Sequence, residues 1–247
     1  MTTARQGGGE EDSAELASRF LSQLLDLDPD QVAMLVGKLE HTRVRGPKGS
    51  SFSPLGAAVC LILEGWLVRS VMLPDGRRQI LDFLVPGDIV GVLPAKRTPS
   101  ARQMINLTAA RVATISVHQL ESLQRQSSRL AFALMEAVAR TGDRLADQVL
   151  RLGRLGAYER TAHLLLELLV RLQRAGLATK VHYPLPVTQE ELADALGLSS
   201  VHLNRVVRAM TREGLVEIHG RAARTLITVL DVERLAEIAM YDMDQQR

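Results

Sequence analysis

The chain has 247 residues, of which 46% are hydrophobic and 3% aromatic, and its formal net charge is +2. This length predicts two domains, with cores built mainly from Leu, Val, Ile and Ala. Cys60 is the only cysteine, which excludes an intrachain disulfide and a metal site made of four cysteines. The sequence has no apolar run long enough to span a membrane and no signal-peptide pattern, so we expect a cytoplasmic protein.

The N-terminal segment divides into a polar tail and two predicted helices. Residues 1–13 contain consecutive glycines followed by consecutive acidic residues, a composition that predicts a disordered tail. Apolar residues recur at helical spacing between residues 14 and 39. Asp28 and Pro29 are typical of a helix start, as an N-cap and as a residue of the first turn.

The pattern changes at residue 41 to short apolar runs that are broken by Gly, Pro and Asp, which predicts strands. Leu73–Gly76 and Pro86–Asp88 are turn signals, and Ala109–Val117 is the expected last strand. Together with the two preceding helices, these strands form one predicted domain over residues 14–118.

A long helix is predicted over residues 119–155, where mostly aliphatic residues follow one another at steps of three and four. A seam of this length needs a partner, which is either the domain of strands or a second copy of the chain. Gly153 and Gly156 interrupt the helix and are the expected hinge between domains. The seam consists of Leu130, Leu134, Val138, Thr141, Leu145, Gln148 and Leu152.

Residues 156–247 are expected to form a winged helix-turn-helix domain, which begins with a helix at Tyr158–Ala175. Thr188 and Glu191 have the spacing of a capping box at the start of a short helix. Gly197 follows the apolar face of that helix, at a position where the chain must turn.

A second, basic helix follows the turn. Ser199 is a good N-cap for it, and Arg205, Arg208 and Arg212 lie along it without an acidic residue among them. Side chains of this kind read bases when a helix enters the major groove of DNA. The order of a capped helix, a Gly turn and a capped basic helix therefore predicts a DNA-binding unit.

The expected wing consists of the strands Leu215–Ile218 and Thr225–Val229 and of the turn between them. Arg221 and Arg224 lie near the tip of this turn, where a wing contacts phosphate. From Ser199 to Arg224 five arginines stand against two glutamates, a net charge of +3 that suits a local phosphate footprint.

Catalysis is not expected. The sequence contains no P-loop, no zinc spacing and no Ser/His/Asp or Cys/His order on a plausible scaffold. His163 and Glu167 are one turn apart on an amphipathic helix, a spacing that we interpret as packing and solvation and not as a metal site.

Three segments resemble the Crp/Fnr family of bacterial regulators. Residues 187–205, VTQEELADALGLSSVHLNR, are similar to its helix-turn-helix, especially to a branch with His-x-Asn-Arg in the second helix. Residues 65–91 resemble the family's β-roll, and residues 156–172 resemble the helix that leads into its DNA-binding domain. The resemblance covers roughly residues 16–240 and implies an α+β fold. Its expected parts are an N-terminal β-roll of the cyclic-nucleotide-binding (jelly-roll) type, a long dimerisation helix and a C-terminal winged helix-turn-helix.

The resemblance also implies a homodimer that binds a palindromic promoter site and contacts RNA polymerase. Arg205 matches the most characteristic arginine of the family's recognition helix, whereas Val201 stands where better-known members often have Glu. The loop Gly176–Tyr183 and the turn Leu73–Arg78 are candidates for the polymerase contact, or else ordinary solvated loops. The base-facing positions are Ser200, Val201, His202, Asn204 and Arg205. The expected phosphate contacts are Thr188, Gln189, Ser199, Arg208, Arg212, Arg221 and Arg224.

No cofactor is expected. Members of the family that bind cyclic nucleotides have a Gly-Glu pair after the Pro-Gly-Asp turn and an Arg-Ser step further on. Here Val92 stands in place of the Glu, and Arg97 and Arg102 lie nearby without an Arg-Ser step. One cysteine cannot ligate an iron–sulfur cluster. Haem remains an alternative, with His41, His118 and Cys60 as conceivable ligands.

Two alternative hypotheses for the function stay open at this point. One is a regulator that senses a ligand or haem through the β-roll. The other is a protein-interaction module whose winged helix contacts protein instead of DNA. The arginines of the second helix favour DNA over the latter.

Overall fold

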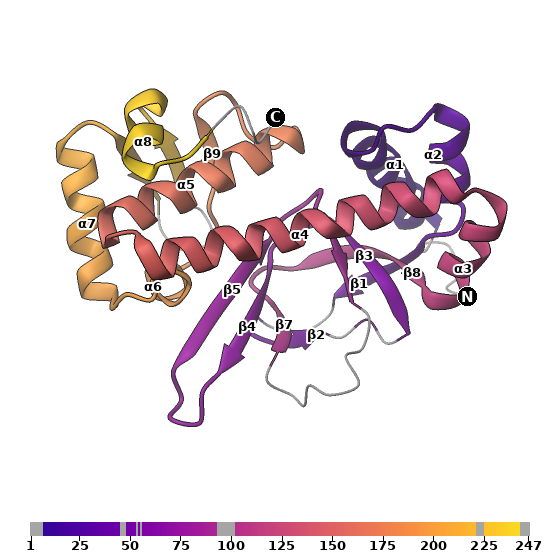
Figure 1. Ribbon diagram of the computed structural model, residues 1–247, viewed down its shortest axis with the longest axis horizontal. Coiled ribbons are helices and arrows are strands. Elements are labelled where there is room, and N and C mark those ends of the chain that lie inside the picture. The colour runs from indigo at the N-terminus through magenta and orange to yellow at the C-terminus, as the bar shows by residue number, and fades with distance from the viewer. Residues whose placement is uncertain are drawn as a thin grey trace. The chain divides into compact units, whose positions relative to one another are not determined.

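The computed structural model describes residues 7–44, 48–52, 54, 56–92, 102–220 and 225–242 (Figure 1). The chain forms two compact units, residues 1–67 with 84–143 and residues 68–83 with 144–247. The predicted architecture is confirmed, because antiparallel strands are followed by a long helix and a winged helix-turn-helix.

The first unit contains α1 and α2, most of the antiparallel strands, α3 and the first part of α4. One of its sheets has the strand order β1-β8-β3-β6, and β2 pairs with β7 in another. The register aligns Glu40 with Thr114 and Cys60 with Thr114 on either side of β8. The elements are α1 (Gly7–Leu24), α2 (Pro29–Val36), β1 (Glu40–Val44), β2 (Ser51–Phe52), β3 (Ala57–Glu64), β6 (Ile89–Gly91), β7 (Arg102–Asn106), β8 (Ala110–Ser116), α3 (Val117–Gln126) and α4 (Ser128–Arg154).

The second unit contains the β4–β5 hairpin, the last part of α4 and the C-terminal helices and strands. A sheet with the strand order β10-β11-β9 packs among these helices (Figure 1). The elements are β4 (Leu67–Met72), β5 (Arg78–Leu84), α5 (Ala157–Arg174), β9 (His182–Pro184), α6 (Gln189–Leu196), α7 (Ser200–Arg212), β10 (Val216–His219), β11 (Leu226–Val229) and α8 (Val232–Ala239).

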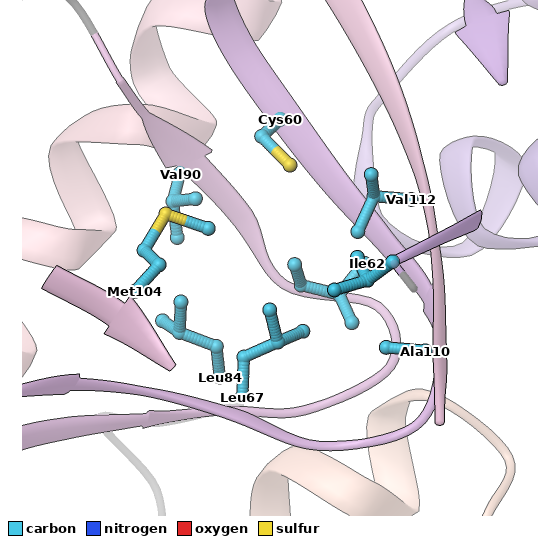
Figure 2. Close-up of a cluster of buried hydrophobic side chains, with 9 residues drawn as sticks. Cys60, Ile62, Leu67, Leu84, Val90, Met104, Ala110 and Val112 are labelled. Carbon is cyan, nitrogen blue, oxygen red and sulfur yellow. The ribbon is translucent and has the colours of Figure 1, made fainter. Parts of the chain in front are cut away.

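Apolar side chains fill the interior of the strand domain. Figure 2 shows them converging from facing strands, with Cys60 and Val112 opposite Met104 and Leu84. Phe52 and Val92 pack against this cluster from its margin. The whole cluster consists of Val44, Cys60, Ile62, Leu67, Leu84, Val90, Met104, Ala110 and Val112.

The N-terminal helices agree with the sequence in part. Asp28 caps α2, because its carboxylate accepts from the Gln31 amide N–H at 2.8 Å and Gln31 closes the capping box. The helix α1 begins at Gly7, inside the segment 1–13 that the composition predicts as a disordered tail. Residues 1–6 lie outside the described residues.

The segment predicted as one helix over residues 119–155 is two helices. α3 ends at Gln126 and α4 begins at Ser128, because Ser127 has extended backbone angles, φ −154° and ψ 104°. Ser116 caps α3 through a capping box with Gln119. The helix that could carry a long seam is therefore α4 alone, which has 27 residues.

A buried carboxylate, that of Asp82, organises the second unit. Its side chain is 3% exposed and lies 2.9 Å from Arg69, 3.1 Å from Arg144 and 3.6 Å from Arg171. Burial by itself would raise the pKa of Asp82, but the charges of Arg144, Arg171 and Arg69 outweigh it and hold the pKa below its usual value. The ion pairs therefore join β5 to β4, α4 and α5.

Glu167 on α5 forms a second buried centre beside the first. It pairs with Arg151 of α4, and Arg171 donates to it at 2.7 Å. The charges of Arg151 and Arg171 overcome the effect of burial and lower the pKa of Glu167. Of the interpretation of His163 and Glu167 as packing and solvation, the packing is confirmed and the solvation is wrong, because both side chains are buried within this network.

The division of the chain differs from the predicted boundaries at residues 118 and 155. The hairpin residues 68–83 and α4 from Arg144 onward belong to the C-terminal unit. The expected hinge at Gly153 and Gly156 lies within this unit, because Gly153 is helical and Gly156 is the N-cap of α5. The ion pairs of Asp82 and Glu167 with arginines of α4 and α5 explain why this part of α4 lies in one unit with the hairpin and α5.

The buried network predicts how stability depends on pH. Burial and then the charge of Arg151 lower the pKa of His163 from 6.5 to about 4. The unfolded chain therefore binds a proton that the folded chain does not, and folding loses stability as the pH falls from 6.5 towards 4. The difference between the two pKa values corresponds to a loss of about 3 kcal/mol at most in the free energy of unfolding.

We expect His163→Gln to remove this part of the pH dependence. Urea unfolding between pH 7 and pH 4 should show a smaller loss of stability in the variant than in the parent chain. His118→Gln is the control, because His118 is exposed at the start of α3. Parallel stability curves for His163→Gln and the parent chain would contradict the assignment.

Candidate nucleic-acid interface

The first helix of the predicted motif begins with the expected capping box. The Thr188 hydroxyl accepts from the Glu191 amide at 3.1 Å, and the Glu191 carboxylate accepts from the Thr188 amide at 2.7 Å. The buried apolar face of α6 then includes Leu192 and Leu196. The exposed Gln189 comes directly after the cap.

The turn between α6 and α7 depends on Gly197. Its φ is 63° and its ψ is 36°, a left-handed conformation that favours glycine. The amides of Gly197 and Leu198 both donate to the carbonyl of Ala193, which closes the end of α6. A Cβ on Gly197 would lie 3.2 Å from the Leu152 side chain, so α4 packs closely against the turn.

The second helix, α7, separates an apolar face from a polar one. Ser199 caps it by accepting from the His202 amide at 3.2 Å. Leu203 and Met210 are fully buried on its inner side, and Val206 is 7% exposed. The helix is thus fixed to its unit along one side only, which leaves the opposite side open.

The open side carries the predicted base-facing residues. Val201 is 64% exposed, Ser200, His202 and Arg205 are exposed, and Asn204 is half-buried. The side-chain amide of Asn204 donates from Nδ2 to the side-chain oxygen Oε1 of Gln189 at 3.2 Å, which links α7 to the start of α6. These residues therefore form one continuous surface across both helices of the motif.

The open side is positively charged. Arg205, Arg208 and Arg212 are exposed, and α7 contains no acidic residue. Within the described part of the chain, no carboxylate forms a salt bridge with any of these three arginines. Their charges are available to an anionic partner.

The wing is present as an antiparallel pair. β10 pairs with β11, with Val216 opposite Val229 and His219 opposite Leu226. β11 also pairs with β9, which places the loop before β9 beside the wing sheet. Arg221 and Arg224, predicted at the tip, lie outside the described residues.

The predicted seam on α4 faces the interior of the same chain. Leu130, Leu134, Thr141 and Gln148 are buried, with at most 6% of each exposed. Val138 lies close to Gly91, since a Cβ at that glycine would come within 2.9 Å of it. Val138, Leu145 and Leu152 are half-buried. These residues are thus covered within the chain itself. The domain of strands, which the sequence left open as the alternative to a second copy, covers the first of them, and the C-terminal unit covers the last.

A second apolar stripe on α4 is exposed. Phe132 is 66% exposed, Met135 47% and Val149 72%. With the exposed Ala139, Gly142 and Ala146 they follow steps of three and four along the helix. The sequence contains this spacing, but the prediction chose the neighbouring stripe of α4 because that stripe has more aliphatic residues.

Comparisons with known proteins agree with this geometry. Residues 159–238 match a Crp-like helix-turn-helix domain, and residues 54–127 match a cyclic nucleotide-binding domain. The transcriptional activatory protein AadR of Rhodopseudomonas palustris is 30% identical over 202 residues, which are 81% of each chain. The chain belongs to the Crp/Fnr family of transcription regulators.

Two further relatives support the assignment to the Crp/Fnr family. The nitrogen fixation regulation protein FixK of Bradyrhizobium diazoefficiens is 30% identical over 184 residues, 72% of each chain. The structure of FixK2 from Bradyrhizobium japonicum has a TM-score of 0.66 at 25% identity, and covers 81% of this chain and 96% of that one. The chain is therefore a Crp/Fnr-type regulator with a helix-turn-helix DNA-binding domain.

The described helices also bear on membrane association. None of them has the length and hydropathy that a membrane-spanning helix requires.

Proposed function

We propose that this regulator binds a palindromic promoter site as a homodimer and acts there together with RNA polymerase. The observation that carries the proposal is the open side of α7, which is basic and free of acidic residues. Two such helices related by a two-fold axis can enter successive major grooves about 34 Å apart. The proposal includes no catalytic step, in keeping with relatives that are named as regulators.

Arg205 is the proposed guanine contact. It is exposed on α7, and an arginine can donate two hydrogen bonds to guanine O6 and N7. Asn204 and His202 are proposed to contact neighbouring bases. Val201 can pack against a thymine methyl group but cannot accept from cytosine, so the target differs from that of members with Glu there.

Phosphate contacts are proposed for the flanks of this surface. Thr188, Gln189 and Ser199 lie where the two helices begin, and Arg208 and Arg212 lie further along α7. Arg221 and Arg224 of the wing remain proposals from the sequence. Such contacts position the protein on DNA without reading its sequence.

We expect Arg205→Ala to weaken binding to the palindromic site by about tenfold to a hundredfold, because one bidentate base contact is lost. Fluorescence anisotropy with a series of single-base variants of the site should show that the preference at one position of each half-site disappears.

Arg212→Ala is the control for loss of charge. It should weaken binding to specific and random DNA equally and make the salt dependence less steep by about one phosphate contact. If Arg205→Ala left both the affinity and the base preference unchanged, Arg205 would not be the guanine contact.

We propose the exposed stripe of α4 as the dimer interface, in place of the buried seam. Phe132, Met135 and Val149 are large apolar side chains that remain open in the single chain. Between them, Ala139, Gly142 and Ala146 are small enough to allow two helices to approach closely. Their alternating steps of three and four match the packing of two parallel helices.

We expect Met135→Glu and Val149→Glu each to shift the chain from dimer to monomer, because a carboxylate is then buried in the apolar interface. Sedimentation equilibrium measures the change. Met34→Glu on α2 replaces a methionine that is 44% exposed elsewhere and should leave the dimer intact. An unchanged dimer in both α4 variants would contradict this interface.

We propose that the strand domain uses neither a cyclic nucleotide nor haem. Val92, which replaces the expected Glu, packs against the apolar cluster and offers no hydrogen-bond acceptor to a ribose. Arg97 lies outside the described residues, and Arg102 lies in β7. Burial raises the pKa of the Cys60 thiol to about 12, which disfavours the thiolate that a haem iron would bind.

Calorimetric titration with cyclic AMP should show no binding in the micromolar range. Freshly purified protein should also lack a Soret band in its absorbance spectrum. Saturable micromolar binding or a Soret band would overturn the respective part of the proposal.

The polymerase contact is proposed for the loop Gly176–Tyr183. Gly176, Leu177 and Lys180 are exposed there, next to the wing sheet that β9 joins. The hairpin turn Leu73–Arg78 is the other candidate for the polymerase contact.

A further inference from the structure

The end of α6 is held by side chains from three other elements. The last carbonyl groups of a helix have no partner within the helix. In α6, Gln79 of β5 donates to the carbonyls of Asp194 at 2.8 Å and Ala195 at 3.3 Å. Gln148 of α4 donates to the Ala195 carbonyl at 2.6 Å, and Arg160 of α5 to the Leu196 carbonyl at 2.9 Å.

An ion pair reinforces the contact from β5. Arg78, the residue before Gln79, lies 2.8 Å from the Asp194 carboxylate on α6, and both side chains are about four-fifths buried. Two successive residues of the hairpin therefore bind the same end of the same helix. This end leads directly into the Gly197 turn and the recognition helix α7.

The hairpin is itself firmly anchored. Three residues beyond Gln79, Asp82 on the same strand forms the buried ion pairs with Arg144 of α4 and Arg171 of α5. One strand thus binds α4 and α5 at one point and α6 at another. A displacement of the hairpin would be transmitted to α6, because Arg78 and Gln79 bind α6 directly and lie on the same strand as Asp82.

We propose that Arg78 and Gln79 are positioning residues for DNA binding, and that the β4–β5 hairpin controls the placement of the recognition helix through them. Gln79 contacts the C-terminal carbonyls of α6, and Arg78 contacts the carboxylate of Asp194. A movement of α6 is passed on to α7, because the Leu198 amide donates to the Ala193 carbonyl across the turn between the two helices. Any ligand or protein that moves the hairpin therefore changes DNA affinity. The inference rests on the proposed binding to DNA.

The neighbouring residue Arg77 provides a matched control. Its guanidinium pairs with Asp75 within the turn of the hairpin and is 77% exposed. Arg77→Ala and Arg78→Ala each remove one positive charge from the same hairpin, but only the second breaks the contact with α6. We expect Arg78→Ala and Gln79→Ala to weaken binding to the palindromic site about fivefold to tenfold, and Arg77→Ala less than twofold.

A double-mutant cycle separates the contact from other effects of the substitutions. In an Asp194→Ala background, Arg78→Ala should have no further effect, and the exchanged pair Arg78→Asp with Asp194→Arg should restore part of the affinity. Hydrogen exchange should be faster at residues 196–199 in Arg78→Ala than in Arg77→Ala. Circular dichroism at the assay temperature should show equal folded fractions.

The outcomes distinguish this inference from the proposed function. If Arg205→Ala weakens binding while Arg78→Ala and Arg77→Ala behave alike, the positioning role is wrong and the proposed function stands. If the parent chain does not bind palindromic DNA, the proposed function is wrong, and the positioning role is then decided by hydrogen exchange. Equal exchange rates at residues 196–199 in the two variants would overturn it.

Discussion

The buried carboxylates of Asp82 and Glu167 are the constraint on which the C-terminal half of the molecule depends. A charge in the protein interior is tolerated only where opposite charges and hydrogen bonds replace the lost water. Here the arginines that do so come from β4, α4 and α5, so these elements must assemble together. The helix-turn-helix is built on this assembly, because α6 ends against its side chains.

The sequence was sufficient to predict the helix-turn-helix because its signals are short-range. Thr188 and Glu191 are three residues apart, and Ser199 acts on an amide three residues away. Gly197 provides a left-handed turn by its own chemistry. Exposure of Arg205 then follows from the helical period, because Leu203 and Val206 occupy the buried side. Local rules of this kind do not depend on the rest of the fold.

The features that the sequence did not predict depend on distant partners. Asp82 and Arg171 are far apart in sequence, and charged residues are expected on the surface unless their partners are known. α4 has two stripes with the same spacing, and only packing shows that Leu134 is covered while Val149 is open. Gln148 was predicted in the dimer seam because it has the seam's spacing, although its side-chain amide donates to a carbonyl at the end of α6.

The position of Asp82 also limits how the molecule can be divided. The two family matches, residues 54–127 and 159–238, suggest interchangeable modules with a cut between them. A chimera joined at such a cut would combine the arginines of α4 and α5 with a foreign hairpin. Without an acid at the position of Asp82, Arg144 and Arg171 would lose the buried carboxylate that they share. The natural unit of exchange is therefore discontinuous, and residues 68–83 must accompany the C-terminal half.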